Sequence, residues 1–276
     1  MHISFISFSG GVAYRKSGRL IKKEAKQLHL FHRVKLYKKH DLPKPISEGL
    51  LSLCSRGFGY WLWKPWIILD MLNHMCYGDI VVYADCGCKI EQDKEAWLSM
   101  LKKLDDKDIL VMQYRQGEIY PWGNSDILRW TKYSMIQYFS QGVGEAWTLQ
   151  QQVLSGFIAV KKTKETIKLM QDWFHIMAFK PELVIDTIGP EENNQIVSYI
   201  EHRHDQAILT GLLLTCSCAN IFFAEETIEP SQNYTRPFIT ALRRRDVSKL
   251  SRKTCVIKFI KELIGESGYK CLHFWK

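Results

Sequence analysis

The chain has 276 residues, 46% of them hydrophobic and 24% charged, which is the composition of a globular protein and not of a disordered or fibrous one. No apolar run approaches the roughly 20 residues that a membrane-spanning helix needs. The first residues lack the basic start and apolar stretch of a secretory signal, so we expect a cytoplasmic protein.

The net charge of +9 is concentrated at one end of the chain. Residues 236–276 carry eleven Lys and Arg against three Asp and Glu, so residues 1–235 are nearly neutral. In the basic segment, apolar residues from Val256 to Ile264 share one helical face. We therefore predict a domain over 1–235 and a basic amphipathic tail over 236–276 that binds an anionic membrane surface. The alternative is an ordinary C-terminal helix docked on the domain.

Strands and helices alternate along residues 1–225. The pattern predicts strands at 3–8, 34–37, 80–83, 109–113, 150–160 and 221–224. It predicts the main helices at 15–30, from 65 onward, and at 95–104, 164–174 and 207–214. We therefore expect an α/β fold with a mostly parallel central sheet flanked by helices. The polar, irregular stretch 181–198 is long enough to be a mobile lid.

The central predicted strand ends in a carboxylate. In GDIVVYADCGC the apolar run Ile80–Tyr83 is followed by Asp85, and Gly87 then allows a turn. Ligands of open α/β sheets lie beyond the carboxyl ends of the strands. A carboxylate there can hold a divalent metal and, through it, a nucleotide phosphate. The alternative is that Asp85 only caps a turn.

A glycine- and aromatic-rich stretch, RGFGYWLWKP, precedes this strand. Arg56 and Lys64 flank the aromatic residues, and Pro65 suits the first turn of a helix. Two cations at a helix start can form a phosphate cradle. Aromatic packing of a helix start explains the same residues equally well.

Three later stretches carry polar groups suited to a sugar ligand. The loop 118–126, EIYPWGNSD, offers an indole face and short polar side chains. Ser155 and Gly156 lie in the strand 150–160, where the glycine lets a ligand approach the backbone. Asp205, in HRHDQ, begins a helix whose dipole stabilises its anion, although it could also be a simple N-cap.

The cysteines predict free thiols. The two C-x-C pairs, Cys86 with Cys88 and Cys216 with Cys218, are spaced too tightly for the usual structural zinc site. Buried small residues are the favoured interpretation.

Five stretches together resemble the bacterial GT-A glycosyltransferases of capsule and lipopolysaccharide (O-antigen) assembly. They are the strand with Ser9-Gly10, RGFGYWLWKP, GDIVVYADCGC, SGF and HRHDQ. The resemblance covers roughly residues 1–225. It implies a Rossmann-like GT-A fold and a nucleotide-sugar donor, a UDP-sugar in the first instance. It also implies Mn²⁺ or Mg²⁺ on Asp85, the first carboxylate of a D-x-D motif. Gly87 stands where the second Asp would be, so the diphosphate, waters and another side chain would have to complete the metal shell. His204, Asp205 or His273 could be that side chain.

The resemblance also implies roles for individual residues. Asp205, His204 and Asp126 are the catalytic candidates: in a retaining reaction, which the D-Q pair favours, Asp205 stabilises the sugar cation, and in an inverting one Asp205 or Asp126 is the base. Trp122 and Asn124 would bind the acceptor. The donor site would comprise Phe8, Ser9, Gly10, Arg56, Tyr60, Trp61, Lys64, Tyr83, Ala84, Asp85, Gly87, Ser155 and Gly156.

We therefore predict a glycosyltransferase acting at the inner membrane face on a saccharide or lipid-linked acceptor of surface polysaccharide assembly. Three other functions remain open. A non-catalytic sugar-binding module could use the same fold, and a nucleotidyltransferase would also use a strand-end Asp with a metal. A nucleic-acid-binding protein would explain the basic tail, but no recognised binding motif accompanies the basic residues, and we expect no nucleic-acid partner.

Overall fold

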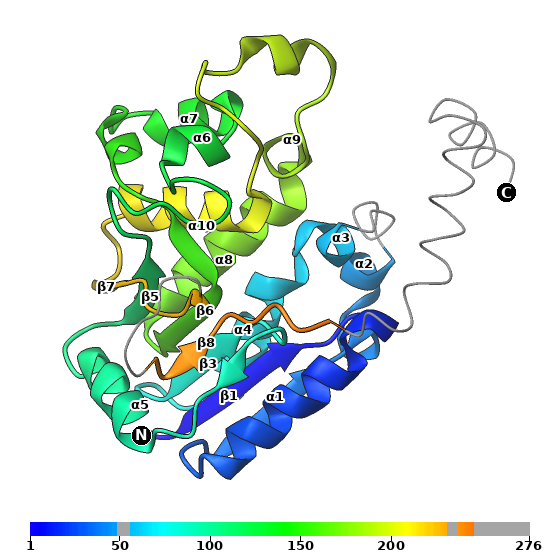
Figure 1. Cartoon of the computed structure of the whole chain (residues 1–276), viewed down its shortest axis with the longest axis vertical. Coiled ribbons are helices and arrows are strands. Elements are labelled where there is room, and N and C mark those ends of the chain that lie inside the picture. Colours follow the sequence, from blue (N-terminus) through cyan, green and yellow to red (C-terminus); the bar gives the residue numbers. More distant parts are fainter. Residues whose placement is uncertain (49–55, 231–236, 246–276) are drawn as a thin grey trace, which may run out of the picture.

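The structure, a computed structural model, describes residues 1–48, 56–230 and 237–245 (Figure 1). Within them a six-stranded sheet has the order β2-β1-β3-β6-β5-β7, and a two-stranded sheet pairs β4 with β8. The strands are β1 (Ile3–Phe8), β2 (Arg33–Tyr37), β3 (Ile80–Ala84), β4 (Lys89–Ile90), β5 (Ile109–Gln113), β6 (Val153–Lys161), β7 (Ile221–Glu225) and β8 (Ile239–Thr240).

Six helices of eight or more residues lie in the described ranges: α1 (Arg15–Gln27), α4 (Trp63–Asn73), α5 (Lys94–Leu101), α7 (Tyr133–Ser140), α8 (Lys164–Phe179) and α10 (His204–Thr215). The short ones are α2 (Lys44–Ser47), α3 (Gly57–Tyr60), α6 (Ile127–Trp130) and α9 (Pro181–Val184). Short 3₁₀ turns occupy 12–14, 39–41, 102–104, 146–149 and 189–194.

The expected mostly parallel sheet flanked by helices is confirmed. β1 pairs in parallel with β2 and β3, and β5 pairs in parallel with β7. β6 alone runs antiparallel, to both β3 and β5. Because of this reversal, the carboxyl end of β3 lies beside the first half of β6, with Ala84 opposite Phe157. The register thereby brings Asp85 next to Gly156, whose carbonyl accepts the Asp85 N–H at 2.9 Å.

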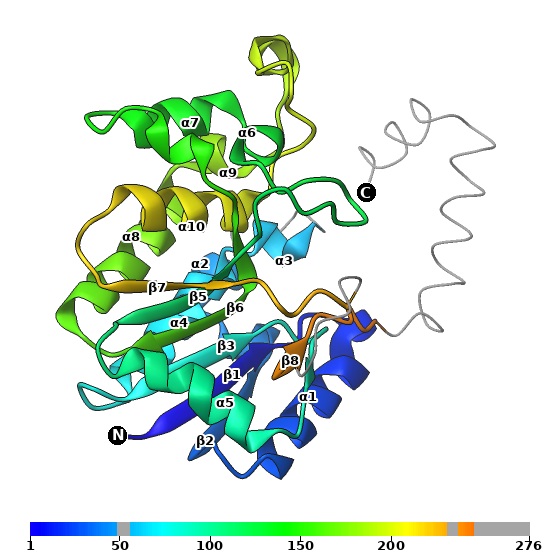
Figure 2. The same ribbon diagram turned by 60° about the vertical axis from the view of Figure 1, so that its left-hand side comes forward.

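The central strand is buried on both faces, and its side chains alternate between two cores. Val81 and Tyr83 pack with α4, α8 and α10, whereas Ile80, Val82 and Ala84 pack with α1 and α5. Figure 2 shows α5 crossing in front of the sheet. The alternation continues to Asp85, which therefore lies on the same face as Tyr83, the face that α4 covers.

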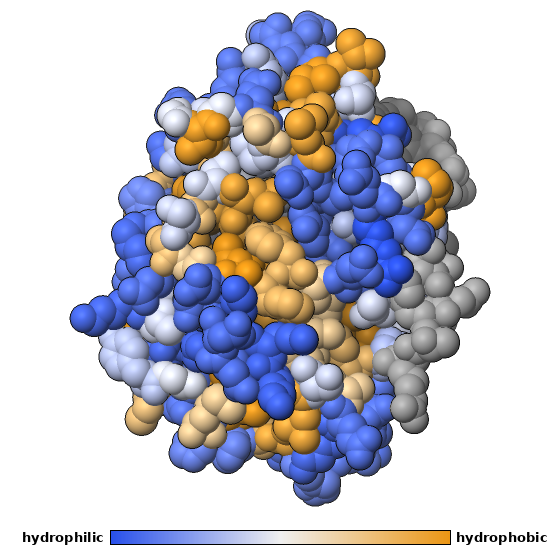
Figure 3. Space-filling view, turned by 90° about the vertical axis from the view of Figure 1, so that its left-hand side faces the viewer, coloured by the Kyte–Doolittle hydropathy of each residue, from blue (hydrophilic) through white to orange (hydrophobic). Residues whose placement is uncertain are grey.

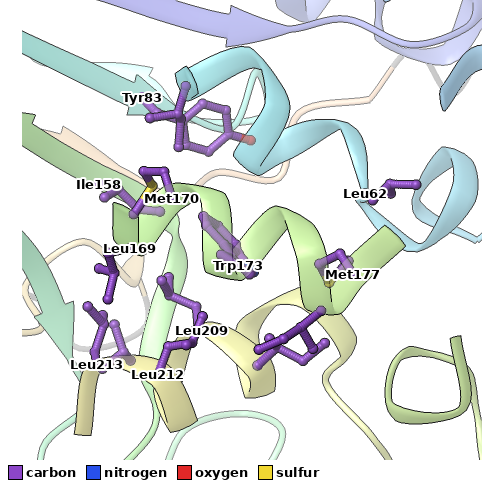
Figure 4. Close-up of a cluster of buried hydrophobic side chains, with 14 of the residues drawn as sticks. Leu62, Tyr83, Ile158, Leu169, Met170, Trp173, Met177, Leu209, Leu212 and Leu213 are labelled. Carbon is purple, nitrogen blue, oxygen red and sulfur yellow. The ribbon is translucent and has the colours of Figure 1, made fainter. Parts of the chain in front are cut away.

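The first core fixes the helices that carry the polar site. Figure 4 shows Met170 and Trp173 of α8 pointing toward Tyr83 and Ile158 of the sheet. Leu209 of α10 lies against the same helix, and α10 also packs on β6. Since α4 and α10 both rest on α8, their first turns have fixed positions at the end of β3.

One side of the molecule carries a continuous apolar band framed by hydrophilic residues (Figure 3). The edge strand β7 runs on this side, and its residues Ile221, Phe222 and Phe223 are half-buried. Among the described residues, the structure contains no helix that is both long and apolar enough to cross a bilayer.

The structure refines several element boundaries. α1 ends at Gln27, β6 begins at Val153, and the stretch 181–198 contains α9 and a 3₁₀ turn instead of being wholly irregular. Its role as a lid stays a prediction. The division of the chain at 235 also stays a prediction, and within the predicted tail only residues 237–245 are described. The tail's apolar face and His273 lie outside the described residues.

Candidate functional site

A buried ammonium group joins four elements at the end of β3. Lys64, in the first turn of α4, is 1% exposed, and its Nζ donates to Asp205 Oδ2 at 2.6 Å and to Ser155 Oγ at 3.1 Å. The same Nζ lies 3.7 Å from Asp85 Oδ1, and the Ser155 hydroxyl donates to Asp205 Oδ2 at 2.9 Å. We call these four residues the Lys64 cluster. It brings together the first turns of α4 and α10, the end of β3 and the start of β6.

The charges in this cluster depend on one another. Burial alone would lower the pKa of Lys64, but the Asp205 and Asp85 carboxylates outweigh it and raise the pKa, so the amine stays charged. The partial loss of water around Asp85 raises the pKa of its carboxyl, with Lys64 and the Tyr83 hydroxyl opposing the shift. The cluster therefore holds two carboxylates against one ammonium group.

Asp85 is the accessible member of the cluster. Its side chain is 42% exposed, and the buried Tyr83 hydroxyl donates to its Oδ1. Its Oδ2 lies 3.3 Å from the point that a Cβ on Gly156 would occupy, so the glycine leaves room for the carboxylate. The structure thus joins Tyr83, Asp85, Ser155 and Gly156, as expected for a strand-end site, with Ala84 fully buried behind them.

Gly87 does not face this site. A Cβ at position 87 would lie 3.1 Å from Arg243 Cα and 3.3 Å from Arg244 N, and the Arg244 N–H donates to the Gly87 carbonyl at 3.0 Å. The side chain of Arg244 makes a bidentate ion pair with Glu24 at 2.7 and 2.9 Å. Residues 243 and 244 thus pack against the turn after β3. They occupy the space that the second Asp of a D-x-D motif would need at position 87.

The residues present do not fit a protein-made metal site. Among the described residues, no group of three His, Cys, Asp or Glu side chains could hold a metal ion. Near Asp85 the donor set is a single exposed carboxylate, and a lysine ammonium already lies 3.7 Å from one of its oxygens. The predicted Mn²⁺ or Mg²⁺ therefore lacks the ligand set that a hard cation needs.

The aromatic stretch before α4 forms a left-handed turn. Gly57, Phe58, Gly59, Tyr60 and Trp61 all have positive φ, between 53° and 84°. The Tyr60 N–H donates to the Arg56 carbonyl at 2.9 Å, which closes the turn. Left-handed helical geometry costs roughly 1–2 kcal/mol for each residue other than glycine. Such strained backbone persists only where surrounding contacts hold it, and it is common at functional sites.

Those contacts come from a second polar cluster. Asp186 accepts from Arg56 at 2.9 Å and from the Tyr60 hydroxyl at 3.0 Å, and Arg56 also pairs with Glu201 at 3.3 Å. The ring of His204 packs against Tyr60 and stacks on Trp61, and its Nε2 lies 3.6 Å from Asp186 Oδ1. We call Arg56, Tyr60, Asp186, Glu201 and His204 the Asp186 cluster. It lies beside the Lys64 cluster because His204 directly precedes Asp205.

The tautomer of His204 follows from its partners. Its Nδ1 lies 2.7 Å from the Val184 carbonyl, which can only accept, so Nδ1 carries a proton. Burial lowers the pKa of His204, and the neutral ring then presents a lone pair at Nε2. This nitrogen is buried without a hydrogen-bond partner in the described structure. It is therefore free to accept from a ligand hydroxyl.

The end of α9 is held by three buried side chains. His202 Nε2 lies 2.9 Å from the Leu183 carbonyl, His204 Nδ1 binds the next carbonyl, and Lys132 Nζ donates to the Ile185 carbonyl at 3.2 Å. These carbonyls would otherwise be unpaired at a helix end. Asp186 follows directly, so this anchoring fixes its position.

The end of β1 is apolar. Phe8 stacks on Trp63 at 4.0 Å between ring centroids and lies 5.8 Å from Phe58. Ser9 Oγ donates to the Tyr14 carbonyl at 2.8 Å, and Gly10 lies against the Phe8 ring. Since β1 pairs with β3, these residues, predicted to belong to the donor site, border the Lys64 cluster.

The loop 118–126 packs against the residue before His204. Trp122 stacks on Tyr120 at 5.0 Å, and the Arg203 guanidinium lies 4.5 Å from Trp122 and 4.0 Å from Trp130. Asp126 lies at the end of this loop, and its Oδ1 accepts a hydrogen bond from Gln151 at 3.1 Å. No contact in the described structure joins Asp126 to the Lys64 cluster. Its role as a base stays a prediction.

Sequence reasoning missed three residues of the site region, Asp186, Glu201 and Arg203. Asp186 lies in a polar, irregular stretch that carries no periodic signal, and Arg203 is one cation within a polar run. The prediction that the cysteines are buried free thiols is confirmed for Cys86 and Cys88, which lie in the second core. Two surface hollows, lined by residues 91–95 with Pro237 and by residues between 26 and 34, contain none of the predicted site residues.

No protein-family model matches the chain, and no curated protein matches it. Several solved structures do match the chain. Mouse xyloside xylosyltransferase 1 is 10% identical over 81% of this chain and 85% of its own, with a TM-score of 0.42. A glycosyltransferase involved in the glycosylation of the major capsid of PBCV-1 is 13% identical over 72% and 80%, with a TM-score of 0.40.

A 4-diphosphocytidyl-2C-methyl-D-erythritol synthase from Anaerococcus prevotii is 10% identical over 78% of this chain and 96% of its own, with a TM-score of 0.32. Similarities this weak do not distinguish one activity from another, so the assignment below depends on the geometry of the site.

The packing of Gly87 gives a stability prediction. Gly87→Ala should lower the free energy of unfolding by about 1–3 kcal/mol, because the new Cβ meets the backbone of residues 243 and 244. Gly87→Asp restores the second D-x-D carboxylate and should destabilise the protein at least as much, without creating a metal site. Urea unfolding, with and without Mn²⁺, measures both effects. A Gly87→Asp variant that is stable and stabilised by Mn²⁺ would contradict this packing.

The two buried histidines give a pH prediction. Burial lowers the pKa of His202 and of His204 below the 6.5 of the unfolded chain, so the unfolded state binds more protons. Stability is therefore fully present above pH 6.5 and is lost as the pH falls, by up to about 1.4 kcal/mol per unit for each histidine. Urea unfolding between pH 7 and 5.5 measures this slope. His202→Gln and His204→Gln should each reduce it, and an unchanged slope in both would refute the assignment.

Proposed function

We propose that this chain is a glycosyltransferase that moves a sugar from a nucleotide-sugar donor, a UDP-sugar in the first instance, to a saccharide or lipid-linked acceptor. The observation that carries the proposal is the Lys64 cluster. Its two carboxylates, Asp85 and Asp205, lie on one ammonium group at the carboxyl end of a central strand, with Nζ–O distances of 3.7 and 2.6 Å. Ligands of α/β sheets bind at this edge.

In the proposed reaction the bond between the sugar's anomeric carbon and the donor diphosphate breaks. A bond to the acceptor oxygen forms, and the acceptor proton passes to the departing diphosphate in a retaining course or to a carboxylate base in an inverting one. The transition state carries positive charge on the sugar and negative charge on the departing diphosphate. Asp205 is the carboxylate on the reacting sugar. Lys64 and Ser155 orient it through hydrogen bonds at 2.6 and 2.9 Å, and the retaining course that the D-Q pair suggests uses it to stabilise the sugar cation.

Neighbouring residues complete the proposed donor site. Arg56, 39% exposed, is the accessible cation for the diphosphate, while Lys64 is too buried to reach solvent. Phe8, Trp61 and Tyr60 supply apolar faces for the base or the sugar. His204 Nε2 has no hydrogen-bond partner among the described residues and lies 3.6 Å from Asp186, and in the proposed site it accepts a ligand hydroxyl. No step in this scheme depends on a metal ion.

The acceptor and the site of action are proposals from the sequence. The basic segment after residue 245 suits an anionic membrane surface and hence a lipid-linked acceptor of surface polysaccharide assembly. Arg243 and Arg244, counted in the basic run, are paired with Glu229 and Glu24 on the domain. The cations available for a membrane are therefore those further along the chain.

The donor site is tested by binding and turnover together. A nucleotide sugar at ten times its dissociation constant should stabilise the protein by about 1.4 kcal/mol in a thermal-shift screen. Asp205→Asn and Asp85→Asn should each lower sugar transfer at least tenfold because each removes a charge from the cluster. Asp172→Asn, at an exposed carboxylate on α8, is the matched control and should keep full activity. Circular dichroism verifies that each variant is folded.

The products of the turnover assay separate the glycosyltransferase from the alternative functions. Pyrophosphate release from a nucleoside triphosphate would indicate a nucleotidyltransferase, and donor binding without hydrolysis or transfer would indicate a sugar-binding module. Normal transfer by Asp205→Asn would remove that residue from the mechanism. The anomeric configuration of the product, read by NMR, decides between retention and inversion.

Membrane binding has its own test. Replacing Arg252, Lys253, Lys258 and Lys261 by Gln should weaken binding to anionic vesicles at least a hundredfold, since each cation near the surface contributes about 1 kcal/mol. Co-sedimentation with phosphatidylserine vesicles measures the change, and phosphatidylcholine vesicles are the control. Equal sedimentation of the variant and the wild type would disprove the anchoring role.

A further inference from the structure

Unpaired polar atoms gather in one region outside the Lys64 cluster. Trp122 Nε1, Arg129 Nε and Arg203 Nε are buried N–H donors without a hydrogen-bond acceptor in the described structure. Asn124 Oδ1, in the same loop, is a buried acceptor without a donor. Buried polar groups are nearly always paired, so such a cluster needs a ligand or ordered water to satisfy it. Three of the four atoms are donors, which favours an oxygen-rich partner.

The two guanidinium groups converge on the same short loop. The Arg203 guanidinium lies 4.5 and 4.0 Å from the centres of the Trp122 and Trp130 rings, which meet nearly at right angles. A terminal nitrogen of Arg129 lies 3.9 Å from the point that a Cβ on Gly123 would take. Both cations therefore flank residues 122 and 123. Backbone bonds from Ile200 to Arg129 and from Arg203 to Trp130, at 2.8 and 3.0 Å, hold the two segments together.

Positive charge is in excess here. No carboxylate in the described structure pairs with Arg129. Glu201 is shared, since one of its oxygens lies 3.3 Å from Arg56 and the other 3.6 Å from Arg203. Asp186 is occupied by Arg56 and the Tyr60 hydroxyl. Arg243 and Glu229, the other charges near Arg203, pair with each other. Three guanidinium groups thus face two carboxylates.

The location links this region to the reaction centre. Arg203 precedes His204 and Asp205, so a ligand on Trp122 lies beside the start of α10. An indole face covers a sugar ring, and a guanidinium binds a carboxylate or phosphate through two parallel hydrogen bonds.

We propose that Trp122, Asn124, Arg129 and Arg203 form an acceptor subsite for an acidic saccharide, one that carries a carboxylate or a phosphate group. The subsite rests on the proposed function for its role as the acceptor side. Arg129 is its specificity-determining residue, because among the described residues its buried Nε has no hydrogen-bond acceptor and no carboxylate pairs with it. The sugar ring lies beside Trp122, whose ring contacts Tyr120 and the Arg203 guanidinium. The acidic group binds Arg129 and Arg203, and a neutral hydroxyl reaches Asn124.

The test is direct binding, which does not require turnover. Saturation-transfer NMR and calorimetry compare acidic probes with their neutral counterparts: methyl β-D-glucuronide with methyl β-D-glucoside, methyl α-D-galacturonide with methyl α-D-galactoside, and glucose 6-phosphate with glucose. At least one acidic probe should bind ten times more tightly than its counterpart, and 0.5 M NaCl should remove the preference. The uronide and phosphate pairs distinguish the two sources of negative charge.

Variants assign the preference to the subsite. Arg129→Gln should reduce it to less than threefold, Arg129→Lys should keep part of it, and Arg19→Gln, an exposed arginine on α1, should keep all of it. If no acidic probe is preferred, or if Arg129→Gln keeps the preference, the proposal is wrong. Donor binding is measured in the same samples. Acid preference without donor binding would defeat the transferase proposal and leave the anionic saccharide site standing.

Discussion

The arrangement of the site depends on the burial of the Lys64 ammonium group. Removing such a charge from water costs several kcal/mol unless close partners compensate it. Here the partners come from three other elements: Asp205 from α10, Ser155 from β6 and Asp85 from the end of β3. The chain can therefore keep Lys64 charged only when α4, α10 and both strands take their observed positions. The arrangement of carboxylates around Lys64 that we propose for catalysis is therefore also needed for the chain to fold.

Around this centre the backbone is strained. Phe58, Tyr60, Trp61 and His204 have positive φ, and all four side chains meet around Asp186 or at the end of β1. On the other side, residues 243 and 244 pack against Gly87, which closes the position of a second metal-binding carboxylate. The turn after β3 thus carries a glycine packed against the backbone of residues 243 and 244, and the nearest cation to Asp85 in the cluster is the buried Lys64. This arrangement leaves the Asp85 side chain 42% exposed and the Asp205 side chain 6% exposed.

Local pattern was sufficient for the positions of the six main strands, but not for their order or for the reversed direction of β6. The run Ile80–Tyr83, the βαβ unit at 3–37 and the strand-end position of Asp85 all follow from hydrophobic periodicity and turn residues. Local pattern could not show that Lys64 and Asp205, 141 residues apart, share a hydrogen bond, because that contact depends on how α10 crosses β6. The family resemblance supplied Asp205 instead. The resemblance also predicted a metal site, which the packing of residues 243 and 244 against Gly87 opposes. Local pattern could not show this contact, because the two segments lie more than 150 residues apart in the sequence.

The most direct test of the account is a double-mutant cycle on Lys64 and Asp205, read as the free energy of unfolding in urea. Lys64→Met alone should cost about 3–5 kcal/mol because it leaves buried carboxylates without a cation. Asp205→Asn in that background should cost much less than it does in the wild type, with a coupling energy of about 2 kcal/mol or more. Additivity within about 0.5 kcal/mol would contradict the account.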